Sequence, residues 1–373
     1  MEHWKCTLEN MVNSNILSAF ANKKVFITGH TGFKGAWLAY ALCKAGAIVK
    51  GYALSPDTVP SLYDQIKEGL NIESVIADIN DAARLEEEVI SFQPEYIFHL
   101  AAQALVRKSY REPLYTFTTN IIGTANVLNA LTKLERPCTV VAITTDKVYE
   151  NKEWHYPYRE SDRLGGCDPY SASKACAELV INSYTQSFFN LSKFDTHNKA
   201  IASVRAGNVI GGGDWSEDRL IPDIAKSLSN NAAVIIRNPA AVRPWQHVLE
   251  PVFGYLQLAL QLSANPVKFS GAWNFGPANA GNLPVSDIVK QAINIWGKGT
   301  IELQVEPGAL HEAGLLKLDI SKAINEMGWK PRMTTTTAIE KTIQWYQSFY
   351  ERHIPAAKLV EADILYYQTL LNK

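Results

Sequence analysis

Six short runs rich in β-branched and other apolar residues alternate with longer segments of helical periodicity through the first half of the chain. Such alternation predicts a parallel sheet with helices on both faces. Several runs are apolar at successive positions, as in 140–143, which is typical of strands buried on both faces. We therefore predict a doubly wound α/β fold whose strands lie at 24–28, 48–54, 74–78, 96–101, 139–145 and 200–205.

The pattern changes after residue 207. Loops rich in glycine, proline, aspartate and tryptophan appear there, at 211–215 and 243–245. Amphipathic patterns then predict helices at 285–296, 321–327 and 337–350. We predict a short, helical N-terminal extension at 1–22, a large domain at 23–206 that contains the sheet, and a smaller α/β domain at 207–373 that is interleaved with the first.

Composition narrows the class of protein. Hydrophobic residues make up 47% and charged residues 20% of 373 residues, which excludes a disordered chain. The net charge of −1 provides no field to hold nucleic acid, although clustered arginines can still bind a phosphate. No run is long enough to span a bilayer and the N-terminus lacks the apolar core of a signal peptide. We expect a cytoplasmic protein without a metal site, because its five cysteines form no ligand motif: Cys6, Cys43, Cys138, Cys167 and Cys176.

A glycine-rich turn joins the first strand to the first long helix. Its glycines have the spacing Gly29-x-x-Gly32-x-x-Gly35. Glycines at such a turn let backbone N–H groups approach a pyrophosphate at the helix N-terminus. The alternative is a generic turn without a ligand. The spacing resembles that of the short-chain dehydrogenase/reductase superfamily, which implies a Rossmann domain at 23–206 with Thr31 and Phe33 beside the glycines in a cofactor site.

The choice of cofactor rests on the resemblance. The second strand ends without the acidic residue that binds an adenosine ribose, and no arginine there favours a 2′-phosphate. We expect NAD, and the ribose contact stays unassigned. Asp78 is placed to reach the adenine, although a carboxylate that merely ends a strand is an alternative. The remaining cofactor-binding residues that we predict are Ile79, Leu100, Ala101, Ala102 and Thr119.

A tyrosine and a lysine share one face of a predicted helix. Asp168 is a candidate cap and Pro169 suits the first turn, so Tyr170 and Lys174 lie at positions i and i+4. A free tyrosine has a pKa of about 10, so a nearby ammonium is needed before it can accept a proton at neutral pH. The pair suits oxidation of an alcohol to a ketone, and the alternative is an ordinary surface pair.

A Thr-Asp-Lys cluster, Thr145, Asp146 and Lys147, follows the fifth strand. The carboxyl edge of an open α/β sheet is where ligands bind, so these side chains can reach a substrate. A simple oxidoreductase needs only a hydroxyl there. Asp146 next to Lys147 indicates a second proton transfer, and a loop ion pair is the alternative.

Five segments carry a specific resemblance. They are Thr-Gly-His-Thr-Gly-Phe-Lys-Gly at 28–35 and the segments 145–154, 164–170, 205–215 and 243–248. Together they resemble the CDP-glucose 4,6-dehydratases of the extended short-chain dehydrogenase/reductase superfamily, from residue 23 to about residue 332. Lys147 stands where dTDP- and GDP-sugar dehydratases usually have a glutamate.

The resemblance implies conversion of CDP-glucose to CDP-4-keto-6-deoxyglucose and water, with hydride passing from C4 to NAD and back to C6. It implies that Tyr170 removes the C4 hydroxyl proton with help from Thr145, while Lys174 orients the cofactor ribose. Asp146 would protonate the departing C6 hydroxyl, and Lys147 would take the C5 proton. The product is a precursor of deoxysugars in bacterial surface polysaccharides such as the lipopolysaccharide O-antigen.

The resemblance also implies a set of substrate-binding residues and a homodimer. Helices at 120–134 and 170–188 would pair between two subunits. The alternatives are that Arg219 is a surface charge near Asp218 and that His247 is a satisfied loop histidine. Trp215 and Trp245 could likewise be packing residues rather than contacts to the sugar or the cytosine. The substrate-binding residues that we predict are Gln103, Arg107, Asn208, Arg219, Arg243 and His247.

Two other functions compete on the residues alone. One is a dehydratase, reductase or epimerase that acts on another nucleotide sugar. The other is a non-catalytic, NAD-sensing module, because a fold does not determine a function. The Thr145-Asp146-Lys147 cluster argues against a simple epimerase, and retention of both acid/base pairs argues against the sensing module.

Overall fold

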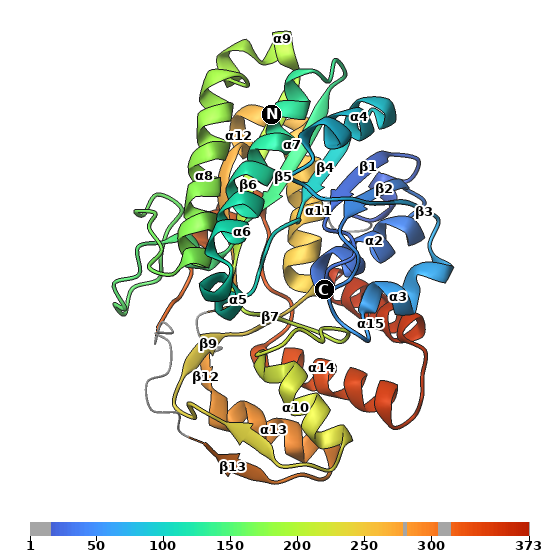
Figure 1. Cartoon of the computed structure of the whole chain (residues 1–373), viewed down its shortest axis with the longest axis vertical. Helices are drawn as coiled ribbons and strands as arrows, with labels where there is room; N and C mark the ends of the chain where they lie inside the picture. Colours follow the sequence, from blue (N-terminus) through green and yellow to red (C-terminus); the bar gives the residue numbers. More distant parts are fainter. Residues whose placement is uncertain (1–15, 279–281, 305–314, 373) are drawn as a thin grey trace.

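The structure is a computed structural model that describes residues 16–278, 282–304 and 315–372. A seven-stranded sheet forms its centre, in the order β11-β6-β5-β4-β1-β2-β3, and every neighbouring pair is parallel (Figure 1). The strands are β1 Lys24–Thr28, β2 Ile48–Ala53, β3 Ile72–Ile76, β4 Tyr96–His99, β5 Cys138–Ile143, β6 Lys199–Ala206 and β11 Gly271–Phe275. The predicted doubly wound α/β fold is confirmed.

The six predicted strands match the observed ones to within a few residues at each end. β5 and β6 are buried at every residue, as their uninterrupted apolar sequences indicate. The seventh strand, β11, was not predicted because it lies in the second half of the chain, where the sequence pattern indicates loops and short elements. It pairs with β6 and extends the sheet, so a segment from the second half of the sequence completes the first domain.

Helices cover both faces of the sheet, and each face has its own apolar core. One face is covered by α2 Phe33–Lys44 and α11 Leu249–Ala264, and α3 Leu62–Ile66 and α15 Ala356–Leu371 pack onto α2. The other is covered by α4 Ala82–Phe92, α7 Gly123–Thr132 and α8 Pro169–Ser187. Shorter helical pieces are η2 Lys67–Gly69, α5 Val106–Arg111, α6 Pro113–Phe117, η3 Thr118–Ile122, η4 Asp146–Val148, η5 Leu191–Lys193, α9 Phe194–His197 and α12 Pro266–Phe269.

A smaller region built mostly from later residues lies beyond the carboxyl ends of the strands (Figure 1). The predicted helix at 285–296 is confirmed, and the one at 337–350 starts two residues earlier because Thr334 caps it. Among the described residues no helix combines the length and apolar character that crossing a membrane requires. The region comprises β7 Val209–Ile210, β8 Val234–Ile236, β9 Val242–Pro244, β10 Gln246–His247, β12 Asn282–Pro284, β13 Ile301–Leu303, α10 Leu220–Ser229, α13 Val285–Trp296 and α14 Thr335–Tyr350. The helical segment η6 Ala323–Met327 instead packs against β11 of the central sheet and against α11.

Residues 16–22 close one end of the larger core. Residues 1–15 of the predicted extension, with Cys6, lie outside the described residues. The rest forms the short helix η1 Ser18–Phe20, whose Phe20 is fully buried. Its ring lies 5.1 Å from that of Tyr96 and 6.3 Å from that of Phe98, measured between centroids. The end of the extension is therefore part of the core.

Replacing Phe20 with alanine is expected to lower the free energy of unfolding by about 3–5 kcal/mol, because the change opens a cavity against two aromatic rings. Urea denaturation followed by circular dichroism measures the change. Val267→Ala is the matched control, since that side chain is 74% exposed and its loss should cost little. A cost below about 1 kcal/mol for Phe20→Ala would show that residues 16–22 are not part of the core.

Candidate active site

The glycine turn between β1 and α2 is packed too tightly for side chains. Gly29 has a φ of 76°, and a Cβ built on it would lie 2.6 Å from the backbone nitrogen of Ala101. A Cβ on Gly35 would collide with the carbonyl oxygen of Gly29. Gly32 lies at the N-cap of α2 without a side-chain cap. The helix N-terminus is thus left open toward the sheet edge, which fits a bound pyrophosphate.

The other predicted cofactor residues line the same edge. Thr31 Oγ1 donates to the carbonyl of Leu54 at 2.8 Å, which fixes the turn against β2. Asp78 accepts hydrogen bonds from the backbone N–H of Asn80 at 2.9 Å and from its side-chain amide at 3.0 Å. The remaining predicted residues at this edge are partly or fully buried: Phe33, Ile79, Leu100, Ala101, Ala102 and Thr119.

His30, inside the glycine turn, was not singled out from the sequence. Its ring is fully buried, and its Nε2 lies 2.7 Å from Ser74 Oγ. Burial lowers its pKa to about 4, so the ring is neutral. Gly51 leaves room for it, since a Cβ there would lie 2.6 Å from His30 Nδ1. The end of β2 therefore packs against a histidine, and the ribose contact stays unassigned.

Tyr170 and Lys174 lie one turn apart on α8, and both are buried, with 8% and 4% of each residue exposed. Asp168 caps the helix by accepting a hydrogen bond from Ser171 N at 2.9 Å, as the sequence predicts. Lys174 Nζ donates to the carbonyl of Ile143 at 3.0 Å, which anchors the lysine to the end of β5. Burial lowers the pKa of Lys174 to about 8.

Burial raises the pKa of Tyr170 to about 12. A hydrogen bond with Thr145 and the charge of Arg219 oppose that rise, while the charge of Asp146 adds to it. A proton acceptor at this position therefore needs further positive charge around it before it can work at neutral pH.

Asp146 is the only carboxylate among the predicted catalytic residues, and it is 4% exposed. Its Oδ1 accepts a hydrogen bond from Thr145 Oγ1 at 3.0 Å. Burial raises the pKa of Asp146 above its ordinary value, while the charges of Lys147 and Arg243 oppose the rise. An acid whose protonated form is favoured by burial can donate a proton to a leaving group.

Lys34, in the first turn of α2, joins this cluster although sequence reasoning did not select it. Burial lowers its pKa to about 8, and the like charges of Lys174 and Arg219 lower it further, whereas Asp146 raises it. The positive charge of Lys34 is also disfavoured by the helix dipole, whose positive end lies at the first turn of α2. The signal available in the sequence was a lysine between Phe33 and Gly35 in the cofactor turn.

The predicted phosphate contacts lie at the same opening. Arg219 donates to Asp214 Oδ2 at 3.0 Å, rather than pairing with Asp218. Arg107, from α5, instead pairs with Asp218 at 3.3 Å. Asn208 and Arg243 are half-buried on the segments that follow β6 and form β9. The charge of Arg219 acts on Tyr170 and that of Arg243 on Asp146, so these two arginines lie close to the predicted catalytic residues.

Gln103 and His247 lie in the interior, although both were predicted to bind substrate. The Gln103 side chain is occupied, because its Nε2 donates to Leu105 O at 3.1 Å and to Thr116 Oγ1 at 2.9 Å. His247 is fully buried, and its Nδ1 accepts from Leu249 N at 3.3 Å. The hydrogen bonds of Gln103 favour a structural role for it. His247 lies in strand β10, and its Nε2 is buried without a hydrogen-bond partner among the described residues, so it is not the satisfied loop histidine of the alternative.

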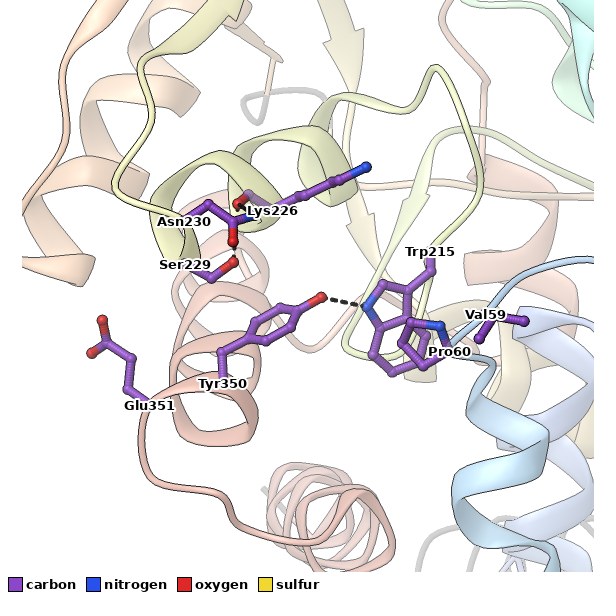
Figure 2. A pocket seen from close by; sticks show the side chains of 8 residues that line it. All are labelled: Val59, Pro60, Trp215, Lys226, Ser229, Asn230, Tyr350 and Glu351. Atoms are coloured by element: carbon purple, nitrogen blue, oxygen red, sulfur yellow. Dashed lines mark hydrogen bonds between the residues drawn. The ribbon is translucent and has the colours of Figure 1, made fainter.

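Trp215 packs against helix α14 instead of facing Tyr170. Its Nε1 donates to Tyr350 Oη at 2.7 Å, and its ring lies 5.4 Å from that of Phe349. Figure 2 shows it on the wall of a surface pocket of about 340 Å³. Packing is therefore the interpretation that the structure favours for Trp215. The other residues that line the pocket are Val59, Pro60, Lys226, Ser229, Asn230, Tyr350 and Glu351.

A protein-family model described as GDP-mannose 4,6 dehydratase matches residues 26–342. This chain belongs to that family. The CDP-glucose 4,6-dehydratase of Salmonella typhimurium is 48% identical over 91% of this chain and 94% of its own length. The UDP-glucose 4-epimerase of Mycoplasma pneumoniae is 24% identical over 88% of this chain and 98% of its own. The suspected family relationship is confirmed.

Solved structures of dehydratase-family relatives share the fold. A UDP-glucose 4-epimerase of Stenotrophomonas maltophila, solved with NAD and a UDP-sugar, superposes with a TM-score of 0.75 at 22% identity, covering 89% of this chain and all of that one. A dTDP-glucose 4,6-dehydratase of Streptomyces venezuelae, solved with NAD, gives 0.74 at 21%, covering 87% and 97%. At these identities the likeness establishes the fold alone.

Gly207→Ala is expected to lower kcat about 100-fold. A Cβ there would lie 2.6 Å from Asp146 Oδ2, so the carboxylate must move, and a displacement of about 1 Å near the chemistry can have this effect. Steady-state kinetics measures the change. Gly165→Ala is the control, because its Cβ would meet only Glu150 Cβ at 3.5 Å, an ordinary contact. Unchanged turnover in Gly207→Ala would contradict the placement of Asp146.

Proposed function

We propose that the protein is an NAD-dependent CDP-glucose 4,6-dehydratase, a hydro-lyase that forms CDP-4-keto-6-deoxyglucose and water. The observation that carries the proposal is the meeting of two acid/base pairs at the carboxyl edge of the central sheet. Tyr170 and Lys174 come from α8, and Asp146 and Lys147 from the end of β5, with Thr145 hydrogen-bonded to members of both pairs. The name of the 48% identical relative supports the choice of substrate.

The residues of the glycine turn fit NAD. The crowded Gly29 and Gly35 and the open N-terminus of α2 would hold its pyrophosphate, and Asp78 would reach the adenine. Relatives of this fold were solved with NAD. Bound NAD would supply a reversible hydride acceptor, taking hydride from C4 of the sugar and returning it to C6.

In the oxidation step, Tyr170 accepts the proton of the C4 hydroxyl. Its pKa of about 12 in the ligand-free protein is too high for this task. The Lys174 ammonium one turn away stabilises the phenolate. Thr145, which hydrogen-bonds Tyr170, would also hold the substrate hydroxyl in line.

In the elimination step, the new ketone acidifies the C5 proton. Lys147 would take that proton as the neutral amine, and protonated Asp146 would donate one to the departing C6 hydroxyl. Burial of Asp146 keeps its protonated form accessible, which a leaving hydroxyl requires. A 4-epimerase has no use for this second pair, so the pair favours dehydration over epimerisation.

The substrate diphosphate would bind to Arg243, Arg219 and Asn208. Arginine suits a phosphate because its planar donors can bind two oxygens at once. The side chain of Asn208 makes no hydrogen bond to the part of the chain that the structure describes, so its amide can serve the ligand.

Turnover of CDP-glucose, dTDP-glucose and GDP-mannose with NAD is the test, followed by the alkali-induced absorbance of 4-keto-6-deoxy sugars. We expect kcat/KM to be at least about 10-fold higher with CDP-glucose, and Tyr170→Phe to lower it by about 10²–10⁴-fold. Activity with another sugar alone would overturn the substrate. Bound NAD without any turnover would revive the sensing module.

We also propose that the protein is a homodimer. Apolar side chains are exposed along α6, η3 and α8, which contact one another. Figure 1 shows α6 next to α8. The helices predicted at 120–134 and 170–188 belong to this surface. A cytoplasmic location and a role in O-antigen synthesis stay predictions of the resemblance. The exposed apolar residues are Leu114 at 80%, Ile122 at 51%, Leu179 at 58% and Phe188 at 59%.

Leu179→Glu is expected to convert the dimer into a monomer, because it buries a charge in the proposed interface. Light scattering after size exclusion measures the mass against the 41.4 kDa chain. Leu365→Glu, on α15, is the control, since that side chain is equally exposed at 58% but lies outside the proposed surface. A wild-type monomer, or a Leu179→Glu dimer, would contradict this interface.

A further inference from the structure

Glu178 lies two turns after Tyr170 and one turn after Lys174, on the same face of α8. It is 5% exposed and lies beneath the reacting groups. Glu178 is neither one of the site residues predicted from the sequence nor a reactant in the proposed mechanism. A carboxylate this deeply buried is costly unless its oxygens are fully paired, so its partners indicate what it does.

Both oxygens of Glu178 are occupied. Oε1 accepts from Thr144 Oγ1 at 2.6 Å and from Arg205 Nε at 3.0 Å. Oε2 accepts from Ser203 Oγ at 2.8 Å and from Arg205 Nη2 at 3.0 Å. Arg205 is itself 4% exposed, and its pairing is bidentate. One carboxylate therefore joins the catalytic helix to β6 and to the residue that follows β5.

The contact with Thr144 connects Glu178 to the catalytic loop. Thr144 directly precedes Thr145 and Asp146, and its backbone N–H donates to Val204 O at 2.8 Å. The loop that carries both catalytic side chains therefore starts from a residue held on two sides, by the β6 backbone and by Glu178.

The charge of Glu178 also acts on Lys174. Burial lowers the pKa of Lys174, and Glu178 raises it in opposition. Around the ammonium lie Lys34 on α2, whose like charge disfavours it, and His99 on β4, which burial holds neutral. Tyr170 lies one turn earlier on the same helix. Among these groups Glu178 supplies the negative charge that favours the ammonium form.

We propose that Glu178 is a positioning residue of the active site: it keeps Lys174 protonated and fixes the end of β5 from which Thr145 and Asp146 extend. The inference rests on the proposed function, because it assigns Glu178 a task in that reaction. The Arg205 guanidinium forms an ion pair with Glu178 on the side of the protein interior. Lys174 lies on the side of the reacting groups, where the negative charge of Glu178 favours its ammonium form.

The test is the pH dependence of kcat and KM with CDP-glucose for wild type, Thr144→Val, Ser203→Ala and Glu178→Gln. The first two substitutions each remove one hydrogen bond to the same carboxylate, but only Thr144 adjoins the catalytic loop. We expect Thr144→Val to lower kcat about 10-fold at unchanged KM. Ser203→Ala should stay within about twofold of wild type.

Glu178→Gln addresses the charge. Turnover needs protonated Lys174, so kcat falls as the pH rises through the pKa of that lysine. Removing the carboxylate charge lowers this pKa, so the high-pH decline should begin about one pH unit lower than in wild type. Circular dichroism and the melting temperature show whether each variant folds. If Glu178→Gln does not fold, the comparison of Thr144→Val with Ser203→Ala still decides the test.

The outcomes separate this inference from the function itself. A wild type that does not turn over CDP-glucose fails the proposed function. If the wild type is active, equal losses in Thr144→Val and Ser203→Ala would show that the carboxylate only stabilises the fold. If kcat of Glu178→Gln declines at the same high pH as kcat of the wild type, whatever its absolute value, the proposed role of the Glu178 charge would likewise be overturned.

Discussion

The whole site depends on one constraint, the parallel arrangement of the central sheet. Because β1, β4, β5 and β6 run in the same direction, their carboxyl ends share one edge. The glycine turn follows β1, the catalytic cluster follows β5, and the Asn208 segment follows β6. Segments far apart in sequence therefore meet without any of them being long.

That edge gathers charge in a place where water is scarce. The positive charges of Lys34, Lys147 and Arg243 act on Asp146, while Arg219 pairs with Asp214 and Lys174 lies near Glu178. Removing such groups from water costs several kcal/mol for each ion. The Glu178–Arg205 ion pair beneath the site offsets part of this cost and holds α8 against β6. The excess of cations is matched to a ligand that brings diphosphate groups, so binding of such ligands also stabilises the folded protein.

Much of the fold and the chemistry could be predicted because the information is local. The strands follow from apolar runs, and the Tyr170–Lys174 pair follows from helical spacing. What could not be predicted depends on distant partners. Glu178 resembles any helix residue until Arg205 from β6 is placed against it, and Lys34 resembles a surface lysine until burial beside Asp146 is known. The interior positions of Gln103 and His247 were equally invisible, since burial is set by packing and not by the neighbours in sequence.

The central claim is that one site oxidises C4, eliminates water across C5 and C6, and returns the same hydride to C6. CDP-glucose carrying deuterium at C4 tests it directly, by NMR and mass analysis of the product formed in ordinary water. The account predicts that the deuterium appears at C6 of the same sugar and that C5 acquires hydrogen from solvent. Deuterium that remains at C4, or that is lost to solvent, would contradict it.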